Sequence, residues 1–251
     1  GVIEGRTAAV RDGYSDGPHN HGMPVWDWAE LRECVAAIDA LGFQPHIHAI
    51  GDEGLTESLN AIEHAQRMNG STTHPRPVIT HVQMLNPRDI PRFAQLNIVA
   101  NFEPLWACND PLQAELTAPV IGPEREMWQY PMKSILDTGA IVSMGSDWPV
   151  TDQNPLACME VAVTRLVPDD PNSTVWNPAE RLSVAEAVTA YGLGVARQAG
   201  EETTWGSLEV GKRADFVVLS RDIFTIDPTT IHHAFVDETW LGGQQIFSRN
   251  P

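Results

Sequence analysis

The chain has few cysteines, few basic residues and no long apolar stretch, and each shortage excludes a class of protein. Its 3 cysteines, Cys34, Cys108 and Cys158, lie far apart and form no CxxC motif. This spacing argues against a disulfide framework and against a thiolate zinc site, and it favours a reducing, cytoplasmic compartment. No run of about 18 apolar residues occurs, which argues against a membrane-spanning helix.

The shortage of positive charge is the strongest feature of the composition. The sequence has 16 Lys and Arg against 33 Asp and Glu, and its formal net charge is -17. A surface of this sign repels phosphates and anionic lipids, so we expect neither nucleic acid nor a membrane as a partner. The hydrophobic share of 42% is ordinary for a folded protein, and a chain of 251 residues can bury a sizeable core.

Strand and helix patterns alternate through most of the chain. Apolar residues recur at helical spacing over 26–41, and an extended run over 43–49 follows. Further strands are predicted at 77–81, 98–102 and 140–145, and further helices from residue 52, at 86–96 and near 124–136. Four prolines within 103–123 predict a long loop there. This alternation predicts a parallel sheet with crossover helices, in either a barrel or an open doubly wound form.

The last hundred residues show two clear helix starts and then change character. Asn154 and Pro155 suit the N-cap and first helical position, and Ser183 with Glu186 forms a capping box. From Gly206 onward, Gly-rich turns alternate with short β-type runs such as 216–219 and 245–247, which predicts a small β module. Only four α/β-type strands precede this tail. The chain therefore holds either half of an eight-stranded barrel or a modest open sheet.

Polar residues fall at the carboxyl ends of the predicted strands. His46 and His48 end one strand, His81 ends the next, and Asp147 comes just after a later one. In parallel α/β folds this edge collects ligands and catalytic groups. Neutral imidazoles and a carboxylate are ligands that zinc prefers, and a bound metal lowers the pKa of water towards neutrality. A carboxylate beside that water is suited to accept its proton, and Asp147 fits this role.

Several segments resemble one family when they are taken together. The segments 48–52 (HAIGD), 80–83 (THVQ) and 145–150 (GSDWPV) resemble the fifth, sixth and eighth strand motifs of the amidohydrolase superfamily. Further similarity lies in 162–165 (AVTR), 176–178 (WNP), 206–212 (GSLEVGK) and 214–216 (ADF). The most similar branch is the amidohydrolase 3 group, which includes N-substituted formamide deformylases. The resemblance covers nearly the whole chain from Gly42 onward.

The resemblance implies a fold and a domain organisation. Members of the family have a (β/α)₈ TIM barrel flanked by a β-sandwich that both chain ends build. Residues 1–200 are then expected to form the C-terminal half of the barrel, strands five to eight with their helices, and residues 201–251 part of the composite β-sandwich. The first-strand HxH motif and the fourth-strand ligand are expected to lie before Gly1. Open sheet edges would remain, so we expect another chain, in a homo-oligomer, to cover them.

The resemblance also implies the roles of individual residues. His48 and His81 match the metal-binding histidines of the family, and Asp147 matches its eighth-strand aspartate, a metal ligand and proton shuttle. The expected cofactor is a divalent metal, zinc above others, and the expected substrate is a small molecule with a non-peptide C–N bond, such as an amide or a formamide. Two alternatives stay open: a related metal-dependent lyase or deaminase, and an inactive fragment or binding domain that pairs with another chain.

Further residues are candidates for substrate contact or for support of the metal ligands. His46 shares a strand face with His48, Arg125 suits a substrate carboxylate or a nearby acid, and Trp148 suits the wall of an apolar pocket. Asp52 is interpreted as a helix N-cap. The remaining histidines lack ligand spacing tied to a strand end and are expected at the surface: His19, His21, His64, His74, His232 and His233.

Overall fold

The computed structural model describes residues 1–70 and 75–249, so His74 lies outside the described residues. Contacts divide the chain into two compact units. The first unit consists of Gly1–Phe102 and Asn109–Val142, and the second consists of Glu103–Cys108 and the chain from Ser143 onward. Among the described residues, none of the helices combines the length and the apolar character that a bilayer crossing requires.

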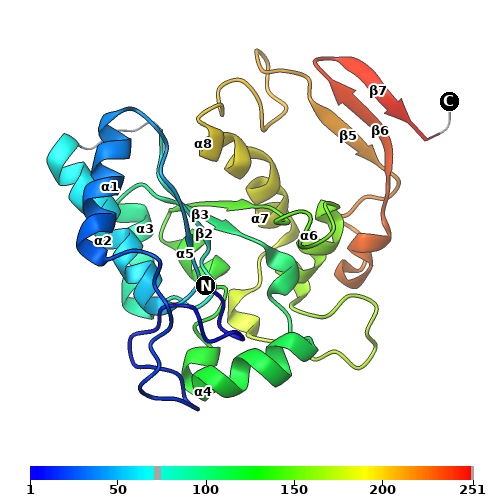
Figure 1. Ribbon diagram of the computed structural model, residues 1–251. Coiled ribbons are helices and arrows are strands. Elements are labelled where there is room, and N and C mark those ends of the chain that lie inside the picture. Colours follow the sequence, from blue (N-terminus) through cyan, green and yellow to red (C-terminus); the bar gives the residue numbers. More distant parts are fainter. Residues whose placement is uncertain (71–74, 250–251) are drawn as a thin grey trace. The chain divides into compact units, whose positions relative to one another are not determined.

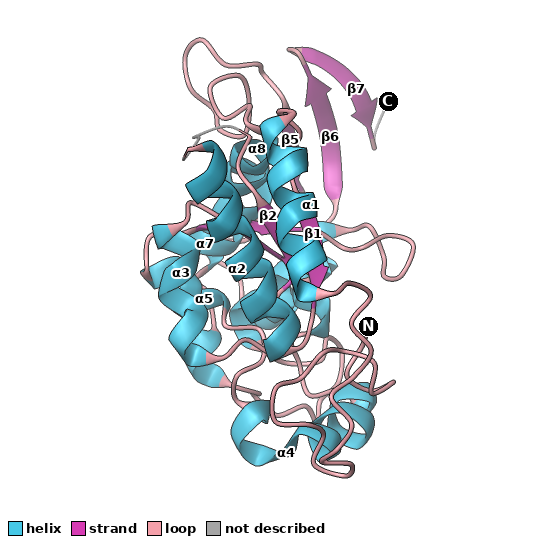
Figure 2. Cartoon of the chain, turned by 60° about the vertical axis from the view of Figure 1, so that its left-hand side comes forward, coloured by secondary structure: helices cyan, strands magenta, loops and turns pink. Residues whose placement is uncertain are grey.

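Two helices of the first unit lie side by side (Figures 1 and 2). Helix α1 (Trp28–Ala40) begins where the Asp27 carboxylate accepts hydrogen bonds from the first-turn amides, and α2 (Asp52–Asn69) begins after Gly51. The Nη2 atom of Arg32 in α1 lies 2.6 Å from the Glu57 carboxylate in α2. Because α2 has Gly51 as its N-cap, Asp52 is the first helical residue, and the interpretation of Asp52 as the N-cap is wrong. The buried Asp52 carboxylate accepts a hydrogen bond from the Arg11 amide.

Four short strands form a sheet in the order β1-β2-β3-β4, and their bounds are His46–Ala49, Val78–His81, Val99–Phe102 and Ile141–Met144. Both β1 with β2 and β2 with β3 pair in parallel. The predicted parallel α/β fold is confirmed, and each strand falls inside its predicted range. Closure into a barrel stays a prediction, because four strands leave a sheet with two ends.

The segment between β3 and β4 differs from the sequence prediction. Instead of a long loop it contains three helical segments: η2 (Pro104–Trp106), the π-helical η3 (Leu112–Thr117) and α4 (Ala118–Glu126). The prolines lie where helices tolerate them, at or just before first turns and, for Pro123, after a kink at Gly122 with φ 79°. The helix predicted at 124–136 is also wrong, since α4 ends at Glu126 and α5 covers only Met132–Asp137.

The remaining helical elements of the first unit follow β2. A 3₁₀ turn, η1 (Pro87–Asp89), leads into α3 (Ile90–Gln95), as the pattern over 86–96 predicts. A separate buried cluster joins the amino-terminal segment to α4 and consists of Ile3, Ala8, Val10, Tyr14, Ile50, Met84, Val120 and Ile121. The hydroxyl of Tyr14 donates a 2.9 Å hydrogen bond to the Ala8 carbonyl, and burial raises the pKa of Tyr14 to about 12.

In the second unit both predicted helix starts are confirmed. Helix α6 (Pro155–Thr164) has Asn154 as its N-cap, with Pro155 in the first position. Helix α7 (Val184–Thr189) begins with the Ser183–Glu186 capping box and continues through η5 (Ala190–Gly194) into α8 (Val195–Ala199). Between α6 and α7 lies the short η4 (Pro178–Glu180).

The tail forms a three-stranded antiparallel sheet, drawn in orange and red in Figure 1. Its strands are β5 (Phe216–Leu219), β6 (Val236–Leu241) and β7 (Gln244–Ser248), and β6 was not among the expected runs. The 3₁₀ helix η6 (Pro228–His233) precedes β6. A small apolar cluster of Leu156, Ile223, Ile231 and Ala234 packs η6 against α6. This packing places η6 next to α6.

Candidate metal centre

Two of the predicted ligands lie next to each other in the first unit. His48 in β1 pairs in register with Thr80, and Ala49 pairs with His81, so the two histidines are offset by one position on adjacent parallel strands. Their ring centroids are 4.4 Å apart, with an interplanar angle of 72°. Strand pairing therefore brings together two imidazoles that are remote in sequence.

The backbone at the end of β2 is unusual. His81 and Val82 have φ angles of 76° and 44°, in the left-handed region that side chains with a Cβ rarely adopt. Each such residue costs on the order of 1 kcal/mol, and such strain is concentrated at functional sites. His81 is 7% exposed, and the following segment is fixed because the Gln83 carbonyl accepts a 2.7 Å hydrogen bond from the Tyr130 amide. The turn that carries His81 is thus held by its surroundings.

An apolar cavity of about 500 Å³ lies beside β1 in the first unit. Both His46 and His48 line it, as expected for two residues on the same strand face, and Trp26, Trp28 and Ile38 supply apolar walls. The Nε2 atom of His48 lies 3.2 Å from the Gly1 carbonyl oxygen. Such an apolar cavity with a few polar groups is typical of small-molecule sites.

The third predicted ligand, Asp147, belongs to the second unit. It follows β4, is exposed and has a φ of 51°, so it shares the left-handed conformation of His81. The Tyr191 hydroxyl donates a 3.2 Å hydrogen bond to the Gly145 carbonyl, and burial raises the pKa of Tyr191. These contacts support the strand end that precedes Asp147. The meeting of Asp147 with the two histidines stays a prediction.

Arg125 and Trp148, the other tentative site residues, have different surroundings. The Arg125 guanidinium donates hydrogen bonds of 2.8 Å and 2.7 Å to the carbonyls of Ile121 and Gly13, and a longer one to Ser15. Arg125 therefore connects the amino-terminal segment, at Gly13 and Ser15, to α4 through hydrogen bonds. Trp148 is 67% exposed. A role in substrate binding stays a prediction for both residues and for His46.

Three histidines of the first unit were expected at the surface. His19 and His21 are exposed as expected, and His64 is partly buried, with its Nε2 atom 3.2 Å from the Glu33 carboxylate.

Sequence reasoning missed a histidine cluster in the second unit. His232 is instead largely buried, with 13% of its side chain exposed, and its Nδ1 lies 2.5 Å from the carboxylate of Glu160 in α6. The expectation of a surface position is wrong for His232, because the apolar cluster of η6 draws it against α6. Only the adjacency of His232 and His233 signals this cluster in the sequence.

Comparison with known proteins agrees with the α/β fold. The model of the amidohydrolase family matches residues 1–247, and the chain belongs to this family. It is 37% identical to Protein LONG AFTER FAR-RED 3 of Arabidopsis thaliana, over 98% of this chain and 41% of that protein. It is 31% identical to the putative amidohydrolase YtcJ of Bacillus subtilis, over 100% of this chain and 46% of that protein.

A third relative and a solved structure extend the comparison. The N-substituted formamide deformylase of Arthrobacter pascens is 28% identical, over 95% of this chain and 43% of that protein. The crystal structure of an uncharacterized metal-dependent hydrolase from Pyrococcus furiosus superimposes with a TM-score of 0.74 and 28% identity, over 90% of this chain and 43% of that one. The chain thus spans less than half the length of the curated relatives it matches, and it corresponds to their C-terminal part.

Proposed function

We propose that the chain supplies part of the active site of a metal-dependent hydrolase that cleaves a non-peptide C–N bond, such as an amide or formamide bond, in a small molecule. The observation that supports this most is the pair of His48 and His81, whose ring centroids are 4.4 Å apart at the ends of adjacent parallel strands. The family match and the metal-dependent hydrolase from Pyrococcus furiosus point the same way. The Arthrobacter pascens deformylase supports a C–N bond as the target.

The residues present fit a divalent ion, with zinc as our proposal. Imidazole nitrogens bind zinc at about 2.0–2.1 Å, and two rings this close are able to reach one ion. The family fold would be a (β/α)₈ barrel with these histidines on its fifth and sixth strands and Asp147 after the eighth. A bound divalent ion supplies Lewis acidity and lowers the pKa of a water molecule.

The chain's own residues have distinct tasks in this proposal. His48 and His81 would hold the ion, since their rings are 4.4 Å apart at neighbouring strand ends. Asp147 accepts a proton from the attacking water and delivers it to the leaving nitrogen, which is general base and then general acid catalysis. The apolar cavity beside His46 and His48 binds the organic part of the substrate and excludes water.

The test is a substitution series in the protein that contains this chain. Asp147→Asn keeps the shape of the side chain but removes the proton acceptor, so kcat on N-substituted formamides or simple amides should fall by about 10²–10⁴-fold. Removal of metal with a chelator should abolish turnover, and added zinc should restore it.

The control is His19→Ala, which removes an exposed histidine from another part of the first unit and should leave kcat unchanged. Circular dichroism confirms that each variant is folded. Full activity of a folded Asp147→Asn variant, or of metal-free protein, would overturn the proposed function.

A further inference from the structure

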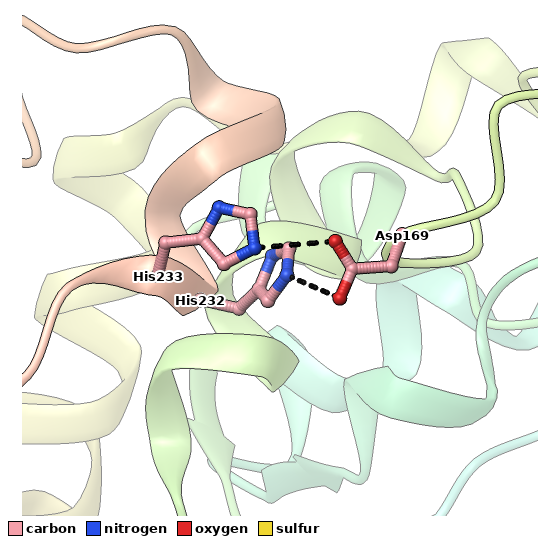
Figure 3. A group of neighbouring side chains, drawn as sticks. All are labelled: Asp169, His232 and His233. Atoms are coloured by element: carbon pink, nitrogen blue, oxygen red, sulfur yellow. Dashed lines mark ion pairs between the residues drawn. The ribbon is translucent and has the colours of Figure 1, made fainter.

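A second cluster of potential metal ligands lies in the second unit, built from residues other than the strand-end histidines. His232 and His233 come from η6, and Asp169 comes from the loop between α6 and η4 (Figure 3). One ligand atom from each residue lies within 4.8 Å of the others. Two imidazoles and a carboxylate form a donor set that zinc prefers.

Two distances within this cluster are close to those between ligands around one ion. His232 Nε2 lies 3.1 Å from one Asp169 carboxylate oxygen, and His233 Nε2 lies 3.2 Å from the other. Two zinc bonds of about 2.1 Å at a tetrahedral angle hold their ligand atoms about 3.4 Å apart. Single ligand atoms of the three residues lie within 4.8 Å of one another, so the side chains must move closer together to share one ion.

Glu160 fixes the orientation of the His232 ring. Its carboxylate is 2% exposed, and the same oxygen lies 2.5 Å from His232 Nδ1 and 3.0 Å from the His232 backbone nitrogen. An ionised carboxylate only accepts hydrogen bonds, so Nδ1 carries a proton, and in the neutral form of the ring Nε2 has the lone pair that a metal needs. A carboxylate that orients a histidine in this way is the usual support of a histidine ligand to zinc.

The other side of the His232 ring faces Asp169, and its Nε2 forms an ion pair with that carboxylate when the ring is protonated. Its Nε2 is buried, and no partner among the described residues meets it with suitable geometry, although the Asp169 oxygen is only 3.1 Å away. In the neutral ring the Nε2 lone pair would repel the carboxylate oxygen, so a cation, either a proton on Nε2 or a metal ion, belongs between the two atoms. A divalent ion satisfies both atoms and His233 at once.

We propose that Asp169, His232 and His233 form a second divalent-metal site that takes zinc and links two segments of the second unit. The ion would join the loop that contains Asp169 to η6, two segments more than 50 residues apart in sequence. Three protein ligands leave the fourth tetrahedral position to water, because Asp169 and His233 are 69% and 51% exposed. Glu160 is the positioning residue for His232.

Zinc titration of the chain, monitored by calorimetry, tests this site, and the test does not depend on catalysis. Wild-type chain should bind one more zinc than Asp169→Asn or His233→Ala, and zinc should raise its Tm by more than it raises theirs. Both substitutions change exposed side chains, so the variants should fold. Glu160→Gln should keep the site but weaken its zinc affinity by about 10–100-fold.

The matched control is His19→Ala, which removes an exposed histidine of the first unit. It should retain the full stoichiometry and the full zinc-induced rise in Tm. Equal zinc binding by wild-type chain and by folded Asp169→Asn and His233→Ala variants would overturn the proposal. So would an equal loss in His19→Ala, because that result indicates nonspecific binding to surface histidines.

Discussion

At the scale of single residues, two of the proposed strand-end ligands have an unfavourable backbone conformation. His81 and Asp147 have φ angles of 76° and 51° although neither is glycine. The sequence identifies both residues, because their types and their positions after strands point to metal chemistry. It does not reveal their backbone conformation, since that depends on contacts such as the hydrogen bond from the Tyr130 amide to the Gln83 carbonyl. The backbone strain at the proposed ligands is therefore known only from the structure.

The carboxylate of Asp52 leads to a prediction about pH. Burial raises the pKa of Asp52 above its ordinary value, although the hydrogen bond from the Arg11 amide opposes this shift. The folded chain therefore binds the Asp52 proton more tightly than the unfolded chain does. The stability contributed by this proton is complete below the unfolded pKa near 3.8 and is lost as pH rises through the folded pKa.

Asp52→Asn removes this titration. The Tm of the variant relative to wild type should therefore increase between about pH 3 and pH 7, by about 2–4 °C for each kcal/mol. Thermal unfolding followed by circular dichroism at a series of pH values measures the difference. Asp16→Asn is a contrasting control, because its salt bridge with Arg6 lowers the pKa of Asp16 and the trend should reverse. A difference for Asp52→Asn that shrinks as pH rises would contradict the account.

At the scale of elements, two helix starts, at Ser183 and at Asn154, were predicted correctly from the sequence. In the Ser183 capping box, the Ser183 hydroxyl accepts a 3.2 Å hydrogen bond from the Glu186 amide, and the Glu186 carboxylate accepts a 2.7 Å bond from the Ser183 amide. Both bonds involve residues three positions apart. Such short-range geometry is encoded locally, so the sequence predicts this helix start and also the Asn154 cap of α6.

Ser183→Ala should lower the stability of the chain by about 1 kcal/mol, because the Glu186 amide loses its acceptor at the start of α7. A chain of this length then loses about 2–4 °C in Tm, measured by scanning calorimetry. Ser183→Thr keeps the hydroxyl and should recover most of the loss. If the alanine and threonine variants melt together at the wild-type temperature, the cap contributes nothing.

Helices with several prolines were the least predictable elements. The segment from Leu112 to Glu126 forms η3 and α4 in spite of Pro119 and Pro123, and the sequence pattern indicated a loop. Packing explains the difference, because Val120 and Ile121 are buried in the cluster with Ile3 and Tyr14. These partners lie more than 100 residues earlier in the chain. Long-range burial of this kind overrides local propensity and is invisible to a short sequence window.

At the scale of the whole molecule, the sequence predicted the parallel α/β fold and a small β module in the tail, but the compact units follow other boundaries. The first unit ends at Val142, inside β4, whereas the predicted domain boundary falls at residue 200. That boundary, the closed barrel and the composite β-sandwich stay predictions, as does the covering of open sheet edges by another chain. Sequence patterns define individual strands, whereas barrel closure depends on strands that must pair with both ends of this sheet.

The most direct test of the central claim is anomalous X-ray diffraction at the zinc absorption edge, from crystals of the zinc-loaded protein that contains this chain. We predict an anomalous peak within about 2.0–2.2 Å of one ring nitrogen of His48, one ring nitrogen of His81 and a carboxylate oxygen of Asp147. A peak at Asp169, His232 and His233 would be a separate result. Crystals with zinc in solution but no anomalous peak between His48 and His81, or with Asp147 directed away from that peak, would contradict the account.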